Sequence, residues 1–207
     1  MARLRPYAPD DLDALYRICL LTGDAGKDAS ALYRDPQLVG HIYAAPYGVL
    51  EPEHAFVVED EGGVAGYIVG THDSEAFSDR MERDWWPALR RRYADARGLN
   101  AADRQRIGTI MRPERQPAQL TAPCPAHIHM NLLPHLRGRG IGSHLLETWI
   151  EQARAAGVRG IHLGASATNA GGIAFWTRSG FAPALQTKGA VWFTMELGSR
   201  AGRAGSG

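Results

Sequence analysis

The clearest chemical pattern in the sequence is a short run of glycines and arginines, Arg137-Gly138-Arg139-Gly140-Ile141-Gly142-Ser143. Glycines allow the backbone to turn tightly and to approach a ligand closely, because they carry no Cβ. An amphipathic helix pattern starts within the run, and the free N–H groups at a helix start favour phosphate. Two arginines add fixed positive charge. The run therefore predicts a phosphate-binding loop; a plain strand-to-helix turn with solvated arginines is the alternative.

Two common phosphate-binding motifs do not fit this run. A dinucleotide-binding G-x-G-x-x-G that starts at Gly138 would need a glycine at position 143, which is Ser143. A P-loop ends in Gly-Lys followed by Ser or Thr, and the sequence contains no such triplet. The remaining motif is R-x-x-G-x-G, at Arg137, Gly140 and Gly142.

The elements that must position this loop can be predicted from hydrophobic periodicity and from turn residues. Strands are expected at 2–7, 55–60, 64–72, 127–133, 161–166 and 190–197, with a hairpin turn at Gly62-Gly63. Helices are expected at 9–21, at 30–44, twice within 75–111, from the glycine loop to about Ala156, and at 170–179. Loops are expected at 22–29 and at 112–125, which contains four prolines. This order predicts a mixed α/β domain with one central sheet.

Composition and charge limit the functions open to the chain. It has 207 residues, 44% hydrophobic and 22% charged, as in a single globular domain. A net charge of +1 argues against a nucleic-acid binder. Apolar runs are too short to cross a membrane, and charged residues interrupt any signal peptide in 1–20, so we expect a cytoplasmic protein. Cys19 and Cys124 are too few and too widely spaced for a disulfide framework or a zinc site, and we expect no metal.

Two segments resemble the hallmark motifs of the GNAT family of N-acetyltransferases. LLPHLRGRGIGSHLL at 132–146 is similar to the acetyl-CoA motif of the family. NAGGIAFWTRSGF at 169–181 resembles the second motif, in which Trp176 stands where the family often has Tyr. The resemblance implies one domain over 1–197, with a mixed, mostly antiparallel sheet flanked by helices. A helical insert at 74–125 precedes the cofactor-binding strand, and 198–207 is a flexible tail.

A narrower resemblance covers much of the N-terminal half. The segments at 18–29, 43–60 and 80–93 look like bacterial acetyltransferases related to the acetyltransferase-like C-terminal region of O-GlcNAcases. That region of the animal enzymes is generally regarded as catalytically silent. The resemblance therefore leaves two functions open: direct acetyl transfer from acetyl-CoA to an amine, or a module that binds acetyl-CoA or CoA without turnover.

The resemblance also assigns roles to the residues around the loop. Backbone N–H groups from Arg137 to Ser143 are expected to hold the pyrophosphate, and residues 131–133 to pair with the pantetheine arm. The N–H of Leu132 is the candidate donor to the thioester oxygen, with Leu133 continuing the same edge. Asn169 is expected to contact the arm, and Trp176 to pack against it. The Trp176 indole is a hydrogen-bond donor only and cannot act as an acid near neutral pH.

The sequence gives less specific predictions for the general base and for the acceptor site. His127, His129 and Asn131 alternate on one strand face, where a histidine suits proton transfer near neutral pH. The alternative is that they are packed or solvated sheet residues. Asp73, at the end of the preceding strand, is another candidate base.

Four further side chains are candidates for binding the acceptor. Asp24 and Asp28 are placed to hold a cation or are simply solvated, and Trp85 and Trp86 either wall the acceptor pocket or anchor the insert. The expected partner is a small-molecule amine or a peptide, without nucleic acid or membrane, and a homodimer is left open.

Overall fold

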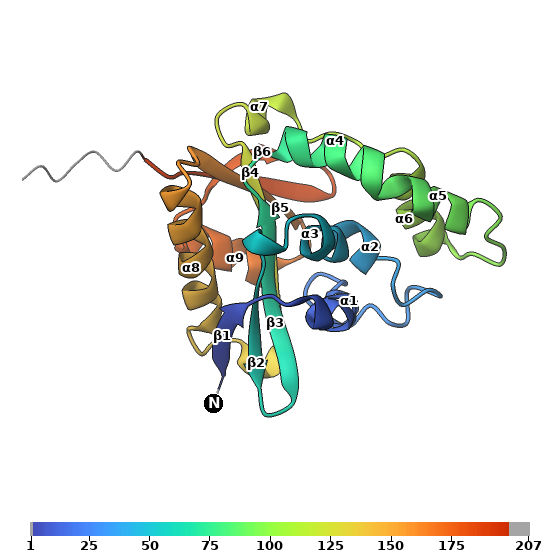
Figure 1. The fold of residues 1–207 in the computed structure, drawn as a ribbon, viewed down its shortest axis with the longest axis horizontal. Helices are drawn as coiled ribbons and strands as arrows, with labels where there is room; N and C mark the ends of the chain where they lie inside the picture. Colours follow the sequence, from blue (N-terminus) through green and yellow to red (C-terminus); the bar gives the residue numbers. More distant parts are fainter. Residues whose placement is uncertain (1, 199–207) are drawn as a thin grey trace, which may run out of the picture.

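A single sheet forms the centre of the computed structural model, which describes residues 2–198 (Figure 1). Its strands are β1 (Arg3–Pro6), β2 (Phe56–Asp60), β3 (Gly63–Thr71), β4 (Ala126–Leu132), β5 (Gly160–Ser166), β6 (Ala182–Gln186) and β7 (Ala190–Glu196). They are ordered β1-β2-β3-β4-β5-β7-β6. Strands β4 and β5 pair in parallel, and the other neighbouring strands pair antiparallel. The expectation of a mixed, mostly antiparallel sheet is confirmed.

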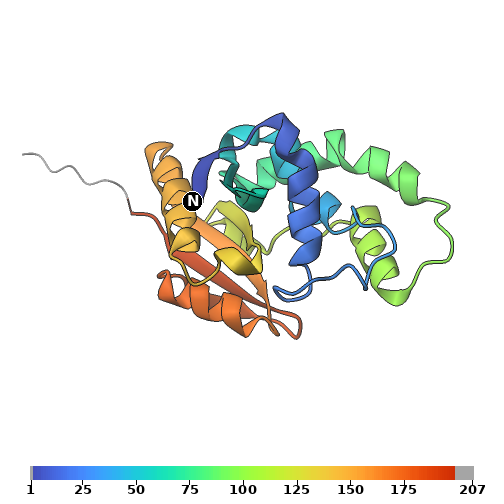
Figure 2. The same ribbon diagram turned by 90° about the horizontal axis from the view of Figure 1, so that it is seen from below.

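Helices cover both faces of the sheet. They are α1 (Leu12–Leu21), α2 (Gly40–Tyr43), α3 (Ala45–Leu50), α4 (Ser74–Asp84), α5 (Trp86–Tyr93), α6 (Ala101–Met111), α7 (Ala118–Thr121), α8 (Ile141–Ala155) and α9 (Ala170–Arg178). Short 3-10 turns lie at Pro9–Asp11, Pro52–His54 and Pro134–Leu136. In Figures 1 and 2, α8 lies on one side of the sheet and α1–α3 on the other.

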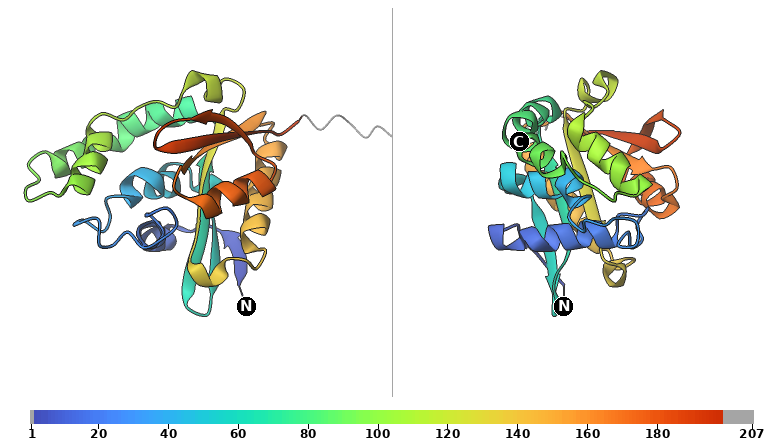
Figure 3. Two further views of the ribbon diagram at one scale, coloured as in Figure 1. Left: turned by 180° about the vertical axis from the view of Figure 1, so that it is seen from behind. Right: turned by 90° about the vertical axis from the view of Figure 1, so that its right-hand side faces the viewer.

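Strand alternation divides the core into two clusters. Val57, Tyr67 and Val69 point to one face and pack with side chains of α1–α6. Their neighbours Val58 and Ile68 point to the other face and pack with α8 and α9. Figure 3 shows that α4–α6 project away from the sheet on the side of α1–α3. The candidate site residues of β4 face this same layer, because Tyr67 pairs with Asn131 and Val69 with His129.

The strongest helix prediction, the one after the glycine loop, is confirmed by α8. Leu145, Trp149 and Ala153 recur at helical spacing and are fully buried against the sheet. The helix ends before Gly157, whose φ of +77° is the left-handed conformation that favours glycine at this position.

Two helix predictions were wrong in detail. Residues 30–39 form turns, and helix begins only at Gly40, because Pro36 disfavours a helical Asp35 and the Asp35 carboxylate accepts from the N–H of Gln37. The stretch 75–111 contains three helices instead of two. The break falls at Trp85, where Pro87 in the first turn of α5 cannot donate a backbone hydrogen bond to α4.

Besides the 3-10 turns, three short elements were not predicted. Helix α3 follows the helix expected at 30–44, helix α7 lies within the proline-rich segment expected to be a loop, and β6 forms a hairpin with β7. Strand β6 is an exposed edge strand that contains Pro183, so it shows neither apolar alternation nor strand composition. Of the predicted tail at 198–207, all but Gly198 lies outside the described residues.

Candidate active site

Strands β4 and β5 part shortly after they meet, which opens a fork in the sheet. They pair only at Ala126 with Ile161 and at His127 with His162, whereas β4 stays paired with β3 as far as Leu132. The N–H of Leu133 donates to the Ala65 carbonyl on the β3 side, at 2.9 Å. Backbone groups alternate along a strand, so the N–H of Leu132 points to the open side. This edge is free to pair with an extended ligand.

A cavity of about 1070 Å³ lies beside the glycine loop, and we call it the loop-side cavity. Of the residues predicted to bind a cofactor, those lining it are Leu132, Arg137, Gly138, Gly140, Gly142, Ser143, Asn169 and Trp176. Leu133, Arg139 and Ile141 belong to the same segment but do not line it. Leu133 and Ile141 pack into the core instead, and Arg139 is exposed.

The glycine loop presents unpaired donors to this cavity. Gly138 and Gly140 have φ values of +71° and +76°, a conformation that only glycine adopts without strain. The first hydrogen bond of the following helix runs from the N–H of His144 to the Gly140 carbonyl, at 3.1 Å. The N–H groups of Ile141, Gly142 and Ser143 therefore precede the helical ladder and are available to an anion.

Close packing explains the glycine at position 142. A Cβ there would lie 3.3 Å from Leu132 and 3.3 Å from Phe175, tighter than ordinary contact. Helix α8 can thus start directly against the end of β4 and against α9. The loop-side cavity is therefore bordered by the donors of the loop and by the open edge of β4.

Arg137 differs from the expectation for this loop. Its backbone N–H donates to the Pro134 carbonyl at 3.1 Å, so it is not free to bind a phosphate. Its guanidinium donates to the carbonyls of Leu132, at 3.0 Å, and of Gly26, at 2.8 Å. Arg137 thereby fastens the loop at 22–29 beside the cavity, and the available backbone donors begin only after it.

Asn169 and Trp176 both take part in structure as well as lining the cavity. The Asn169 side chain caps α9 by accepting from the N–H of Gly172 at 2.9 Å. Trp176 is 8% exposed and packs edge-on against Phe175 and Phe181, with ring centroids 5.0 and 5.4 Å apart. Only part of the indole faces the cavity.

A second cavity of about 780 Å³ lies between the sheet and the insert, and we call it the insert-side cavity. Its walls include Phe77, Met81 and Trp86 from α4 and α5, and Arg106 and Arg115 from the rest of the insert. The insert contributes no lining residue to the loop-side cavity. Along β4, residues 127–129 line the insert-side cavity and residues 130–132 the loop-side cavity. The two cavities therefore adjoin along one strand, at the fork.

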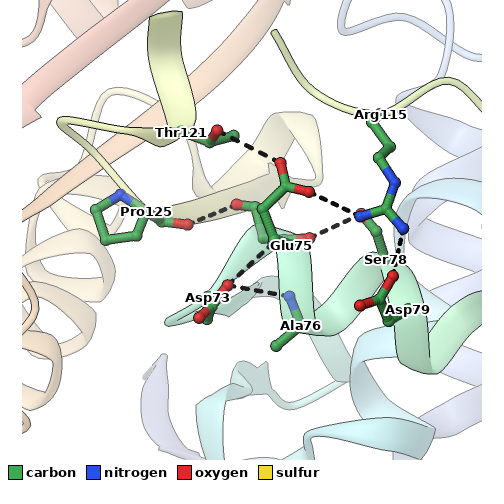
Figure 4. Close-up of polar contacts among 9 residues, drawn as sticks. Asp73, Glu75, Ala76, Ser78, Asp79, Arg115, Thr121 and Pro125 are labelled. Carbon is green, nitrogen blue, oxygen red and sulfur yellow. Dashed lines mark hydrogen bonds and ion pairs between the residues drawn. The ribbon is translucent and has the colours of Figure 1, made fainter. Parts of the chain in front are cut away.

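The rim of the insert-side cavity is fastened by charged contacts on α4 (Figure 4). Arg115 donates to Glu75 at 2.7 Å and also to Asp79, which holds the proline-rich segment against the helix. Thr121 of α7 lies 3.4 Å from the other oxygen of Glu75. These contacts position Arg115 and its neighbours over the cavity.

A chain of hydrogen bonds fixes His127 on the floor of this cavity. The Ser74 hydroxyl must donate to the Pro125 carbonyl at 2.6 Å, so it accepts from His127 Nδ1 at 2.7 Å. His127 Nε2 then accepts from the Tyr47 hydroxyl at 2.6 Å. Burial lowers the pKa of His127 well below its usual value, with His129 and His162 contributing, so the ring is neutral. Both of its nitrogens are occupied.

His129 and Asn131, the predicted catalytic residues, lie on the same strand face but in different cavities. His129 lines the insert-side cavity, edge-on to Tyr43 at 5.6 Å between centroids. Burial, helped by His162, lowers its pKa to about 4. Asn131 lines the loop-side cavity, where its amide donates to the Thr22 hydroxyl.

Three other candidates line neither cavity. The Asp73 carboxylate caps α4 by accepting from the N–H groups of Glu75 and Ala76, both at 3.0 Å (Figure 4). Asp28 accepts from the Ser30 N–H and hydroxyl, which lowers its pKa. Asp24 is exposed in a turn bridged to Lys27. The carboxylates of Asp73 and Asp28 belong to local structure, because Asp favours caps and tight turns, whereas Asp24 takes part in its turn through its backbone.

The sequence left open whether Trp85 and Trp86 wall the acceptor pocket or anchor the insert, and the structure gives each a different position. Trp86 is buried and lines the insert-side cavity. Trp85 does not line it, and its indole N–H donates to the His41 carbonyl at 2.9 Å. Trp85 therefore anchors the insert to α2, and Trp86 forms part of the wall.

Sequence reasoning missed Tyr47, Ser74 and His162. The first two carry no local signal, because they reach His127 from positions 80 and 53 residues away. His162 had one available signal: it is a polar residue inside the apolar strand IHLGAS. Its ring is fully buried on the insert side of β5.

Comparison with known proteins agrees with this geometry. Residues 27–181 match the model of the acetyltransferase (GNAT) family. The chain belongs to this family. The GNAT domain is similar to the crystal structure of SsHAT, with 35% identity, 96% of this chain and 99% of that chain covered, and a TM-score of 0.88.

More distant relatives share the GNAT fold or part of the sequence. Protein O-GlcNAcase of Rattus norvegicus is 26% identical over 160 residues, which are 76% of this chain and 17% of that protein. The chain thus corresponds to about a sixth of the length of that relative. The structure of yncA from Salmonella typhimurium, which includes its cofactor acetyl-CoA, has a TM-score of 0.55 at 16% identity, with 97% and 96% of the two chains covered. At that identity the likeness concerns the fold alone.

Two features are missing from residues 2–198. No helix among them has the length and apolarity needed to cross a membrane. These residues also contain no group of three or more His, Cys, Asp or Glu side chains suited to hold a metal ion.

Proposed function

We propose that this GNAT domain transfers an acetyl group from acetyl-CoA, bound in the loop-side cavity, to an amine bound in the insert-side cavity. Membership of the GNAT family supports acetyl transfer in general. The observation that carries the specific proposal is the meeting of the two cavities along β4. A donor and an acceptor that enter from opposite sides would come together at the fork, which provides the proximity that direct transfer needs.

The residues of the loop-side cavity suit acetyl-CoA. Unpaired N–H groups after Arg137 would hold the pyrophosphate, and the open edge of β4 would pair with the pantetheine arm. The Leu132 N–H points to that edge and would donate to the thioester oxygen as negative charge develops there. Asn169 and Trp176 would border the arm. Acetyl-CoA supplies the activated acetyl group, and the chain supplies binding, orientation and proton transfer.

The insert-side cavity suits an amine on a partly apolar carrier. Aromatic side chains of Tyr47, Phe77 and Trp86 form part of its wall, and Glu82 and Glu114 add acidic groups. Such a lining accommodates a small-molecule amine or a peptide side chain. His129 lies where the cavity meets the fork, and we place it in contact with the amine. Asn131 would act from the cofactor side, and the carboxylates of Asp24, Asp28 and Asp73 have no part in the proposal.

Trp176 does not prevent this reaction. Its indole cannot supply a proton to the departing sulfur. A thiol has a pKa of roughly 8.5, with cysteine as a guide, so its thiolate is a tolerable leaving group without a dedicated acid. We further propose that residues 1–197 act as one domain, with the insert at 74–125 as the acceptor wall.

Calorimetry and a turnover assay test the proposal separately. Acetyl-CoA should bind and raise the melting temperature, because a ligand that binds only the folded state stabilises it. Release of free CoA thiol should then be screened with small primary amines and lysine-containing peptides, against reactions without enzyme. Absence of binding would reject the cofactor assignment. Binding without turnover for every amine would instead indicate a module that only binds acetyl-CoA.

A further inference from the structure

We propose that His162 is the group that accepts the proton lost by the acceptor amine. The inference rests on the proposed acetyl transfer and names a catalytic residue for it. His162 lies on β5 and lines the insert-side cavity. It forms the last β4–β5 pair, opposite His127, so it stands where the two strands part. An amine that reaches the fork from the insert side would meet this position.

The hydrogen bonds of His162 leave one nitrogen available. Its Nδ1 lies 2.6 Å from the Cys124 carbonyl. A carbonyl only accepts, so Nδ1 carries the proton, and Nε2 of the neutral ring carries a lone pair. That Nε2 is buried and has no hydrogen-bond partner. A buried acceptor without a donor is unusual in a folded protein and indicates that a ligand or a bound water supplies the missing donor.

The direction of this lone pair follows from the ring. The two nitrogens of an imidazole point in nearly opposite directions. Nδ1 points to Cys124, which precedes β4, so Nε2 points away from the start of β4 and toward the fork. The Trp192 and His127 rings flank the imidazole, at 6.5 and 5.5 Å between centroids. His162 is 0% exposed, so a flanking side chain such as Trp192 has to shift before the acceptor can meet Nε2, and the contact would then be screened from bulk solvent.

The other two histidines of the cavity are less suited to the task. Both nitrogens of His127 are occupied, and its hydrogen-bond chain ends in the Pro125 carbonyl, which cannot receive a proton onward. Within residues 2–198, no side-chain hydrogen bond fixes the His129 ring in one tautomer, and the ring packs against Tyr43 and Tyr47. Of the three, His162 alone combines a fixed tautomer with a free lone pair.

The proton transfer balances without another reagent. As the amine nitrogen bonds to the acetyl carbon, His162 Nε2 takes up one proton from that nitrogen. The carbon–sulfur bond breaks, and its electron pair leaves on the CoA sulfur. The imidazolium then passes its proton to that sulfur or to water, which restores the neutral ring and the original tautomer.

The surroundings keep His162 neutral before the reaction. Burial lowers its pKa, and the bond to Cys124 only partly offsets this effect. The titratable groups nearest to it are His127 and His129 on β4 and the buried Cys124 thiol, and both histidines also have lowered pKa values. A neutral imidazole is the form that can accept a proton.

The first test examines the ring itself and does not depend on turnover. Histidine nitrogen NMR on the wild-type protein, assigned with His162→Asn, should show His162 as the neutral tautomer protonated on Nδ1. Its Nε2 resonance should shift when a small primary amine is added together with desulfo-CoA, a nonreactive analogue. A ring protonated on Nε2 in the neutral protein would overturn the assignment.

The second test separates a catalytic role from a structural one. In His162→Asn the amide can keep the donation to Cys124 but offers no acceptor at the Nε2 position. We expect kcat to fall about 100-fold or more, with the Kd of acetyl-CoA unchanged. The part of the low-pH fall of kcat/KM that is due to protonation of His162 should be lost, whereas the part due to protonation of the amine should remain. His135→Asn, an exposed histidine bonded to Asp60, is the control and should keep full activity.

The outcomes distinguish the two proposals. Turnover by wild type that His162→Asn leaves unaltered would overturn the role of His162 and leave the proposed function in place. A wild-type protein that acetylates no amine would reject the proposed function, and the role of His162 with it. Should His162→Asn fail to fold, the His162 resonances can be assigned by through-bond NMR experiments. The presence or absence of an Nε2 shift on amine binding to the wild-type protein then decides.

Discussion

The Tyr47 hydroxyl donates a 2.6 Å hydrogen bond to Nε2 of His127, across 80 residues of sequence. Tyr47 lies in α3 and His127 in β4, so the bond ties the helical layer to the floor of the insert-side cavity. The Tyr47 ring also stacks on Phe77 of α4, with centroids 4.5 Å apart. One tyrosine therefore connects the sheet, the N-terminal helices and the insert.

Tyr47→Phe should destabilise the protein without changing its fold. The substitution leaves His127 Nε2 buried without a donor, which costs about 1–3 kcal/mol. Urea denaturation measures the change. Tyr33→Phe is a suitable control, because Tyr33 is only half-buried and its longer 3.3 Å contact with Arg106 should matter by less than about 0.5 kcal/mol. Equal stability of Tyr47→Phe and wild type would show that the bond to His127 is not formed.

Stability should fall as the solution becomes mildly acidic. Burial is the main cause that lowers the pKa values of His41, His72 and His129, each to about 4. Burial also lowers the pKa of His127 well below its usual value. In the unfolded chain these histidines have pKa values of about 6.5. Between these two pKa values the unfolded state binds more protons than the folded state. The contribution of these histidines to stability is therefore complete above about pH 6.5 and is lost as the pH falls toward 4.

The slope of that loss can be measured by urea denaturation at several pH values. One histidine contributes up to about 1.4 kcal/mol per pH unit, so several should give a steeper dependence between about pH 6 and 5. His129→Asn should reduce this slope by the contribution of one histidine. A free energy of unfolding that stays constant over this interval would contradict the neutral, buried state of these histidines.

Gly140→Val should abolish or strongly weaken acetyl-CoA binding while the sheet stays intact. A Cβ at Gly140 meets no atom within 4 Å, so the cost within the protein is conformational. A β-branched residue resists the φ of +76°, by about 1–2 kcal/mol, and its branch would also stand where the phosphate approaches. Calorimetry should show an affinity at least about tenfold lower.

A second glycine provides the control for this substitution. Gly108 in α6 likewise has no atom within 4 Å of its Cβ position, but it is not in the left-handed region. Gly108→Ala should leave acetyl-CoA affinity unchanged. If Gly140→Val folds and binds acetyl-CoA as wild type does, the pyrophosphate must lie elsewhere.

Substitutions of Trp176 should separate packing from catalysis. Trp176→Ala removes a buried indole between Phe175 and Phe181, so we expect a loss of about 3–5 kcal/mol and weaker acetyl-CoA binding. Trp176→Tyr should retain binding and either raise turnover or leave it unchanged, because a phenol can donate a proton. An alanine variant with unaltered stability, affinity and turnover would show that residue 176 is remote from the thioester.

Local patterns in the sequence were sufficient for the regular elements. Helix α8 shows the clear periodicity of Leu145, Trp149 and Ala153, and the glycines before it allow the tight turn that leads into it. Prediction failed where local breaks or a distant partner strand outweighed such patterns. The segment at 30–39 has helical composition, but Pro36 and side-chain bonds to its own backbone hold it in turns. Strand β6 exists only because β7 offers it a partner.

Local sequence was enough to predict the glycine loop and the family, because both depend on residues that are close together in the chain. Tertiary contacts were needed to show which polar residues share a cavity. They place Asp73 at the cap of α4 and bind Arg137 to the carbonyls of Leu132 and Gly26. The folded structure shows these contacts directly. It also brought Tyr47, Ser74 and His162 beside His127. Such sites are assembled by strand register and by helix packing across the whole chain, and neither is encoded in the spacing of adjacent residues.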